Sequence, residues 1–408
     1  MTSMHFIFDF NLKIACVLST LVSIYVTFRY FHIKHESRSI TCSYSTMTFL
    51  CILFTSGLDM GLIMFPLIEF KRYASPEYLG IHPLSLEIGY WSGTAWLFYF
   101  MTTFYFVFIE PHLKIFEHKY MQHMMYILLL LTCAFSAKLF VDYFNFYIPK
   151  TYIQKYPELF THSKLVLYTI ILITVATITA VRSQFIVRIC FGSIIFFAIL
   201  IVWGLFILFK QHTLTQYYLT ILTGLHGYIE HINLFITPMN SYHGFYMYWW
   251  FSWSLIIGKF VAQYVPQGTT PIKLCLWMLI IPIIPLTIWY ALLYLFFTSS
   301  YRMTTYFSIA MLMSSILFLM NSLTSIFQTS AFMLSHSSKK LNMNQALCIS
   351  YFATLIFFIG YAGLSHPNEA MIEIDYVGSF AIFLLYYIAY VMMKRRHIFL
   401  PFIQNKNA

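Results

Sequence analysis

The chain has 408 residues, of which 60% are hydrophobic and only 9% are charged, and its mean hydropathy is +0.73. Since soluble domains average about a quarter charged residues, this composition excludes a globular protein with a water-facing surface. The formal net charge of +10 does not indicate a nucleic-acid partner, because the basic residues are dispersed in short segments and the densest cluster is residues 394–396.

Apolar runs of bilayer-spanning length recur along the whole chain. Backbone groups in lipid must be satisfied within their own segment, and the runs show no strand-like alternation, so we expect α-helices. The first run has no evident signal-peptide cleavage site. The eleven predicted spans are residues 12–30, 46–68, 90–109, 123–141, 164–181, 185–209, 244–264, 273–298, 304–335, 343–363 and 375–393.

Residues 213–237 are apolar but carry several polar side chains, which favours an amphipathic helix at the membrane interface over a further span. With eleven spans, an outside N-terminus and a cytoplasmic C-terminus place fourteen of the 24 lysines and arginines inside and eight outside, with two within spans. This bias agrees with the positive-inside rule and favours that orientation.

The ten spans after the first divide into two sets of five, and because five is odd the second set enters the membrane from the opposite side. This is the arrangement of an inverted repeat, which many secondary transporters use. Glycine-containing first spans in both sets, with Gly57 and Gly61 in one and Gly258 in the other, predict interrupted helices at a mid-membrane site. The predicted units are residues 1–45, the first repeat 46–209, the interfacial segment 210–243, the second repeat 244–396 and a tail 397–408.

Five of the eight tryptophans, with one tyrosine, form two aromatic groups in the spans 90–109 and 244–264. They fit an aromatic belt at the membrane interface. They also fit a box for a quaternary ammonium group, which cannot donate a hydrogen bond but is attracted by ring faces. The two groups are Trp91, Trp96 and Tyr99, and Trp249, Trp250 and Trp253, of which Trp249 and Trp253 share one helix face.

Three of the charged side chains within or at the end of predicted spans bear on function. Asp59 is either protonated or hydrated, or serves as a counter-ion, a ligand for a coupling cation or a proton carrier. Lys138 is either a lysine that extends to the interface or an internal cation in place of Na⁺, paired with Asp59. Glu69 ends its span, and we expect it to face the interface.

The span 304–335 contains a polar cluster of Asn321, Ser322, Thr324 and Ser325. Their oxygens suit Na⁺, but intramembrane Ser and Thr more often bond the backbone of their own helix, and the spacing favours this second interpretation.

Signatures of enzymes and cofactor sites are weak in this chain. The seven cysteines are scattered without a CxxC pair, and HGYIEH at 226–231 matches no zinc-protease motif, so we expect no cofactor or structural metal. An acyl or glycosyl transferase that uses Glu230 and His231 remains the enzymatic alternative.

Four stretches together resemble the betaine/choline/carnitine transporters. FYMYWWFSWSLIIG at 245–258 and the following PQGTTPIKLCLWMLIIPIIPLTIW are similar to the family's W-W-x-x-W helix with its Gly and basic inner loop. SGLDMGLIMFPLIE at 56–69 resembles its glycine-rich unwound helix, and FLMNSLTS at 318–325 is similar to F-x-x-T-S-A-D-S. Trp91, Trp96 and Tyr99 have the spacing of its W-x4-W-x2-Y box, and the resemblance covers about residues 12–396.

The resemblance implies a LeuT-type 5+5 inverted repeat with one extra N-terminal helix. It also implies a bacterial inner-membrane carrier that works by alternating access and is often trimeric. A trimethylammonium group would lie among Trp91, Trp96, Tyr99 and Trp250, with Trp249 and Trp253 beside it. A sodium site would be formed by Asn321, Ser322 and the backbones of Thr55, Leu58 and Phe318.

Departures from the family pattern bear on the coupling ion and the substrate. Asp59 replaces the second glycine of the glycine-rich motif, and Asn321 and Thr324 replace a Thr and the Asp of T-S-A-D-S. They leave the aromatic box intact and weaken the case for Na⁺, so H⁺ or an internal Lys138 is the alternative. We expect a secondary transporter of choline, glycine betaine or carnitine, with Asp59 favouring choline; a sensor that binds without transport is a further alternative.

Overall fold

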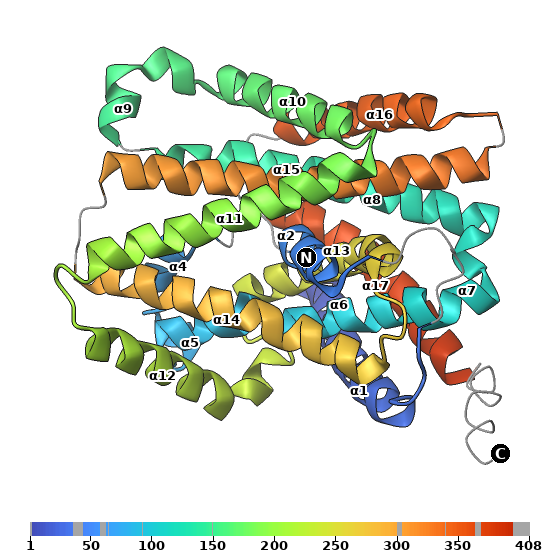
Figure 1. Cartoon of the computed structure of the whole chain (residues 1–408), viewed down its shortest axis with the longest axis horizontal. Helices are drawn as coiled ribbons and strands as arrows, with labels where there is room; N and C mark the ends of the chain where they lie inside the picture. The colour runs from blue at the N-terminus through green and yellow to red at the C-terminus, as the bar shows by residue number, and fades with distance from the viewer. Residues whose placement is uncertain are drawn as a thin grey trace.

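Each of the eleven predicted spans corresponds to helix in the computed structural model, which describes residues 2–35, 44–57, 63, 65–91, 93–148, 150–299, 304–338, 340–363 and 369–394 (Figure 1). Within these ranges every regular element is helical. The long helices are α1 (Thr2–Arg29), α8 (Lys119–Tyr147), α10 (His162–Thr179), α11 (Ser183–Leu208), α13 (Ser241–Val261), α14 (Pro271–Thr298), α15 (Thr305–Ser337), α16 (Met343–Gly363) and α17 (Glu369–Lys394).

Two predicted spans contain shorter helices. The described residues of the span 46–68 include α2 (Thr46–Gly57) and α4 (Pro66–Arg72), and the span 90–109 begins earlier than expected, as α5 (Pro83–Trp91). Pro83 occupies the first turn of α5, where a missing N–H costs nothing. After a turn the chain continues as α6 (Thr94–Phe104), a π-helical turn at Tyr105–Ile109 and α7 (Glu110–Leu113).

Among the described residues, nine helical stretches are long and apolar enough to cross a membrane, which makes the chain a multi-pass membrane protein. The two predicted spans outside this set are 46–68, whose helix α2 is short, and 244–264, which is α13. α13 is rich in Tyr, Trp and Ser, and every side chain from Gly244 to Gly258 is buried. Most residues of α2 and α13 are buried. A helix surrounded by protein need not be uniformly apolar, which explains why these two spans are missing from the set.

α13 lies in the middle of the bundle, against α6 and α17, with α15 and α11 on one side and α14 on the other (Figure 1). The expected interruption of α13 at Gly258 is absent, because this helix is continuous from Ser241 to Val261. Gly258 instead allows α6 to approach, since a Cβ there would lie 2.6 Å from Thr102 Oγ1. Thr102 donates a 2.6 Å hydrogen bond to the carbonyl of Ser254, which fixes the two helices together.

The segment predicted as an interfacial helix forms α12 (Leu214–Glu230), followed by a 3₁₀ turn at Ile232–Phe235. Thr213 and Gln216 form a reciprocal capping box at its start. α12 packs on α5 and α14, and a Cβ at Gly224 would lie 2.6 Å from Leu84. This packing makes α12 a lateral cover for α5.

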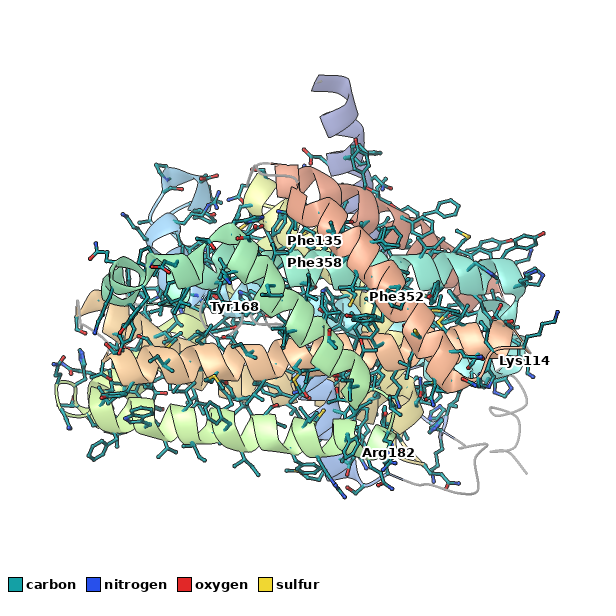
Figure 2. All side chains as sticks on the ribbon, turned by 90° about the horizontal axis from the view of Figure 1, so that it is seen from above. Lys114, Phe135, Tyr168, Arg182, Phe352 and Phe358 are labelled. Carbon is teal, nitrogen blue, oxygen red and sulfur yellow. The ribbon has the colours of Figure 1, made fainter. Side chains whose placement is uncertain are left out.

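The periphery of the bundle is apolar where a bilayer would contact it. Phe352 on α16 is largely exposed, whereas Phe135 and Phe358 are fully buried between helices (Figure 2). Lys114 and Arg182 lie at the edges of the bundle in the same view. An apolar perimeter with charges at its margins is the surface that lipid requires.

Candidate functional site

The turn between α5 and α6 positions the first aromatic group. Gly93 has a φ of 48°, a backbone conformation that side chains disfavour, and a Cβ there would collide with the Tyr228 hydroxyl of α12. Trp91 is the last residue of α5, and Trp96 lies in the first turn of α6. The indole N–H of Trp96 donates to the carbonyl of Trp91 at 3.2 Å, which holds the two rings in a fixed relation.

α13 brings the second aromatic group to the first. The ring centroid of Trp250 lies 4.9 Å from that of Trp91 and 6.2 Å from that of Tyr99, and Tyr99 lies 5.4 Å from Trp96. All four rings are buried, with at most 4% exposure. The four residues of the predicted cage therefore converge, and we call them the aromatic cage from here on.

The other two tryptophans of α13 flank the cage. Trp249 stacks on Trp250 at 5.8 Å with the planes 12° apart, and Trp253 is buried one turn further along the helix. The indole N–H groups of Trp249 and Trp253 meet no acceptor among the described residues. Buried donors of this kind are free to bind a polar group of a ligand.

Aromatic edge-to-face contacts close the cage in this conformation. Trp91 meets Trp250 at an interplanar angle of 77°, and Trp96 meets Tyr99 at 78°. At these separations the rings touch each other directly. Neighbouring rings therefore cover one another in this conformation.

Tyr246 extends the cage and was not anticipated. Its ring lies 5.4 Å from Trp91 and stacks within 6.0 Å of Trp250. The signal was present in the sequence, because Tyr246 precedes Trp250 by four residues and such residues share a helix face. Composition masked it, since 32 tyrosines leave any single one inconspicuous.

Glu69 does not face the interface, which corrects our prediction. It is 2% exposed, and both Tyr242 and Tyr246 donate hydrogen bonds to its Oε1, the first at 2.6 Å. Glu69 lies on the short helix α4, and both tyrosines belong to α13, so this helix encloses the carboxylate. Trp91 faces the same carboxylate, so Glu69 lies at the edge of the cage.

Glu87 is a second buried carboxylate that sequence reasoning missed. It is completely buried on α5 and lies beside Glu69 and Tyr73. The predicted span begins at residue 90, which places Glu87 in the preceding loop. Pro83 was the overlooked signal, since proline in the first helical turn extends the helix to include Glu87.

The predicted sodium-site residues are brought together between α2, α11 and α15, with Leu58 outside the described residues. Ser325 Oγ on α15 lies 3.2 Å from Ser56 Oγ on α2, and Asn321 donates to Ser193 on α11 at 2.8 Å. Thr55 donates to the carbonyl of Cys51 four residues back, and Ser325 also donates to that of Asn321. These are the self-helix bonds that the spacing favoured. Phe318 and Ser322 are buried in the same region.

Lys138 has a partner on its own helix. Its ammonium lies 2.7 Å from Asp142 on α8, and the side chains are 3% and 31% exposed. Lys138 is therefore neither extended to water nor without a counter-ion. Asp59, the partner we considered, lies outside the described residues, so its proposed roles remain predictions.

The residues of the enzymatic alternative lie at the C-terminal end of α12. His226 and Glu230 face each other at 3.6 Å on the outer face of α12 and are 81% and 61% exposed. His231 instead lies with its Nδ1 2.9 Å from the carbonyl of Gly227. Among the described residues no group of three or more His, Cys, Asp or Glu could hold a metal ion.

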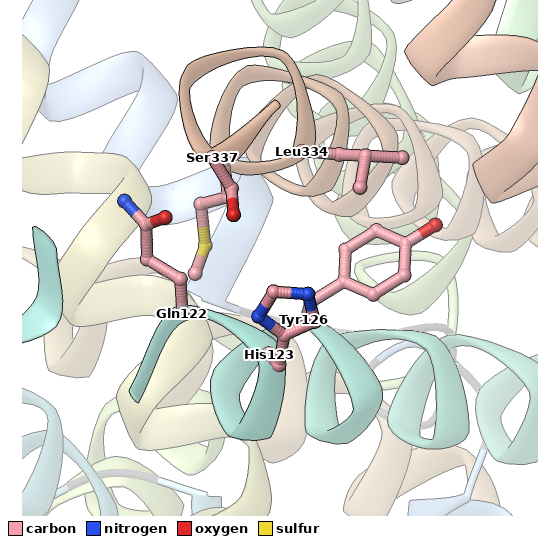
Figure 3. A pocket seen from close by; sticks show the side chains of 6 residues that line it. Gln122, His123, Tyr126, Leu334 and Ser337 are labelled. Carbon is pink, nitrogen blue, oxygen red and sulfur yellow. The ribbon is translucent and has the colours of Figure 1, made fainter. Parts of the chain in front are cut away.

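Two surface hollows lie apart from the cage. One is a small groove between α8 and α15, lined by Gln122, His123, Tyr126, Met333, Leu334 and Ser337 (Figure 3). The other, of about 330 Å³, lies between α10 and α16 and includes Thr174, Asn344 and Tyr351. Neither contains a charged side chain buried against a cluster of rings, so the cage is the stronger candidate site.

Comparison with known proteins adds no relative to this picture. No protein-family model matches the chain, and no curated protein matches it.

Proposed function

We propose that this chain is a secondary transporter of a quaternary-ammonium compound, with the aromatic cage as its substrate site. The observation that carries the proposal is the convergence of Trp91, Trp96, Tyr99 and Trp250 from three helices onto one buried cluster. A belt of interfacial aromatics would place these rings at the lipid surface, and the cage rings are almost entirely buried.

Cation–π attraction explains why rings suit this substrate. A trimethylammonium group offers no hydrogen-bond donor, and each ring face contributes roughly 0.5–2 kcal/mol, depending on how far water is excluded. Four faces offset the loss of hydration and support micromolar to millimolar affinity, the range a carrier needs for release on the far side.

A negative group beside the cage favours a net cation. Glu69 lies against Trp91 and Tyr246 at one end of the cluster, in the position of a counter-ion. We therefore favour choline over the zwitterions glycine betaine and carnitine, which carry their own carboxylate. The indole N–H groups of Trp249 and Trp253 are the donors that a zwitterion's carboxylate would use.

The transport cycle we propose is alternating access in a LeuT-type inverted repeat, in a bacterial inner membrane, with the N-terminus outside, the C-terminus inside and three chains per assembly. The coupling ion would be Na⁺ near Thr55 and Ser322, or H⁺. Because α13 is continuous, the first helix of the second repeat would move as one rigid unit.

Uptake of radiolabelled choline, betaine and carnitine into proteoliposomes, with and without Na⁺ and pH gradients, tests the proposal. Saturable uptake of at least one compound is the expected result. If none of the three is taken up and none quenches tryptophan fluorescence, the substrate class is wrong. Binding without uptake would instead identify a sensor, and turnover of an acyl or glycosyl donor with no binding would favour the enzyme.

A further inference from the structure

Two carboxylates from different helices meet at one end of the aromatic cage. Glu69 on α4 is 2% exposed and Glu87 on α5 is completely buried, and the two side chains lie against each other. They are 18 positions apart in the chain, and the segment between α4 and α5 returns the backbone so that both point into the same space. No part of the substrate proposal requires Glu87.

Tyrosines from residues 73–78, α5, α13 and α14 lie around the pair. Tyr73, Tyr90 and Tyr290 have buried hydroxyls that lack a hydrogen-bond partner of normal geometry among the described residues, and each lies close enough to feel the charge of both carboxylates. Among the described residues, the titratable side chains facing the pair are Tyr73, Tyr78, Tyr90, Tyr242, Tyr246 and Tyr290. Unsatisfied buried hydroxyls directed at a site indicate that it binds something polar.

No cation among the described residues forms an ion pair with either carboxylate. Arg72 is exposed and lies with its guanidinium carbon 3.7 Å from the centre of the Tyr242 ring. His243 accepts a hydrogen bond at Nδ1 from the backbone N–H of Met239, so that nitrogen carries no proton and the ring is neutral. The pair therefore lacks the positive charge that two buried carboxylates need.

The hydrogen-bond pattern distinguishes the two acids. Glu69 Oε1 accepts from two tyrosine hydroxyls, as an ionised carboxylate does, while its Oε2 has no partner of normal geometry. Both oxygens of Glu87 also lack such a partner. A proton on Glu87 that is donated to Oε2 of Glu69 would satisfy an atom of each residue and leave one negative charge in place of two.

We propose that Glu69 and Glu87 form a proton-binding site that holds one shared proton at neutral pH. The proton belongs to the pair, in the way that closely spaced carboxylates titrate together. Two ionised carboxylates side by side in a dry site would repel each other with little screening, so loss of the shared proton requires another cation nearby.

The proton site is physically connected to the aromatic cage. Tyr246 donates its hydroxyl proton to Glu69, and its ring stacks on Trp249 and Trp250. If the cage binds a quaternary ammonium group, as proposed above, the fixed positive charge replaces the proton as the partner of the pair. Cation binding would then release the proton, which makes exchange of a proton for substrate the coupling mode.

Infrared spectroscopy of the purified full chain in detergent tests the proton site without any substrate. At neutral pH we expect the carbonyl stretch of a protonated carboxylic acid, shifted by D₂O, and its loss in Glu87→Gln. Glu77→Gln is the matched control, because Glu77 is an exposed glutamate that accepts from Ser75 outside the pair. If Glu87→Gln does not fold, the wild-type band is measured as a function of pH instead. Loss of the band at alkaline pH supports the proton site, and a band that does not change with pH overturns it.

Absence of that band in the wild type at neutral pH would overturn the proton site. Loss of the band when Na⁺ is added at constant pH would also overturn it, because the pair would then be a sodium site. An unchanged band in both Glu87→Gln and Glu69→Gln would place the proton elsewhere.

A weakly buffered solution with a pH indicator tests the connection to the cage. Added choline should release protons from the wild type, and Glu87→Gln should bind choline with this release abolished. Choline binding without proton release would overturn the exchange mode and leave the transport proposal intact. If choline, betaine and carnitine all fail to bind while the infrared band is present, the transport proposal and with it the exchange mode fail, and the proton site stands.

Discussion

Trp250 is the residue whose removal tests the cage most directly. Its ring contacts those of Trp91, Tyr99 and Trp249 at centroid distances of 4.9, 6.2 and 5.8 Å. Trp250→Ala removes one of the four proposed ring faces and also leaves a cavity in the core. The two effects must be separated, since a destabilised protein binds nothing.

The expected magnitudes differ for the two effects. Loss of one ring face costs roughly 0.5–2 kcal/mol of binding, which is about 2- to 30-fold in Kd. The cavity costs about 3–5 kcal/mol of stability, as for other buried Trp or Phe to Ala changes. Trp250→Phe keeps a ring at the same position and should recover most of the affinity.

Phe251→Ala supplies the matched control. Phe251 is the next residue on α13, is equally buried, and stacks on Phe98 of α6 at 4.4 Å, outside the cage. Choline affinity from tryptophan fluorescence and the unfolding temperature should be measured for both variants. We expect similar destabilisation, with weakened binding only in Trp250→Ala. Equal loss of affinity in the two variants would refute the cage.

Three further predictions concern packing and charge. Gly258→Ala should lower the unfolding temperature, because overpacking against α6 costs about 1–3 kcal/mol, whereas Gly360→Ala, with open space around it, should not. Asp142→Asn should destabilise the protein by about 3–5 kcal/mol because it leaves a buried lysine unpaired. Lys138→Met should destabilise the protein less than Asp142→Asn does, since the Asp142 side chain is partly exposed. A greater loss of stability in Lys138→Met than in Asp142→Asn would contradict this. Burial raises the pKa of Tyr228 to about 12, against about 10 in an unfolded chain. The stability that the protonated Tyr228 gives the folded state is therefore complete below a pH of about 10 and is lost as the pH rises to about 12. Tyr228→Phe should make the unfolding temperature fall less steeply at alkaline pH. An unchanged slope would exclude Tyr228 as the cause of the decline.

The predicted function and the proton site make opposite demands on the same cluster. The cage needs its rings to separate so that a cation can reach their faces, whereas Glu69 and Glu87 are stable only when a positive charge is near. A site that alternates between a proton and a substrate cation meets both demands, because one of the two charges is always present.

Local sequence determined the membrane helices. Apolar runs of about 20 residues predict helices by themselves, because backbone hydrogen bonds in lipid must close within the segment. The positions of Trp249, Trp250 and Trp253 on α13, and of Trp91 before a glycine turn, also follow from local spacing. Bilayer-spanning length and aromatic pattern are properties of contiguous residues, so no tertiary information was needed.

Tertiary structure alone decided which of these residues meet. Trp91 and Trp250 are 159 positions apart, and helical periodicity carries no information on contacts across such a distance. The same holds for Glu69, which Tyr242 and Tyr246 of α13 enclose, and for Glu87, whose helix starts earlier than hydropathy suggested. Burial of a charged side chain depends on what packs around it, and that is set by neighbouring helices and not by the residues beside it in the chain.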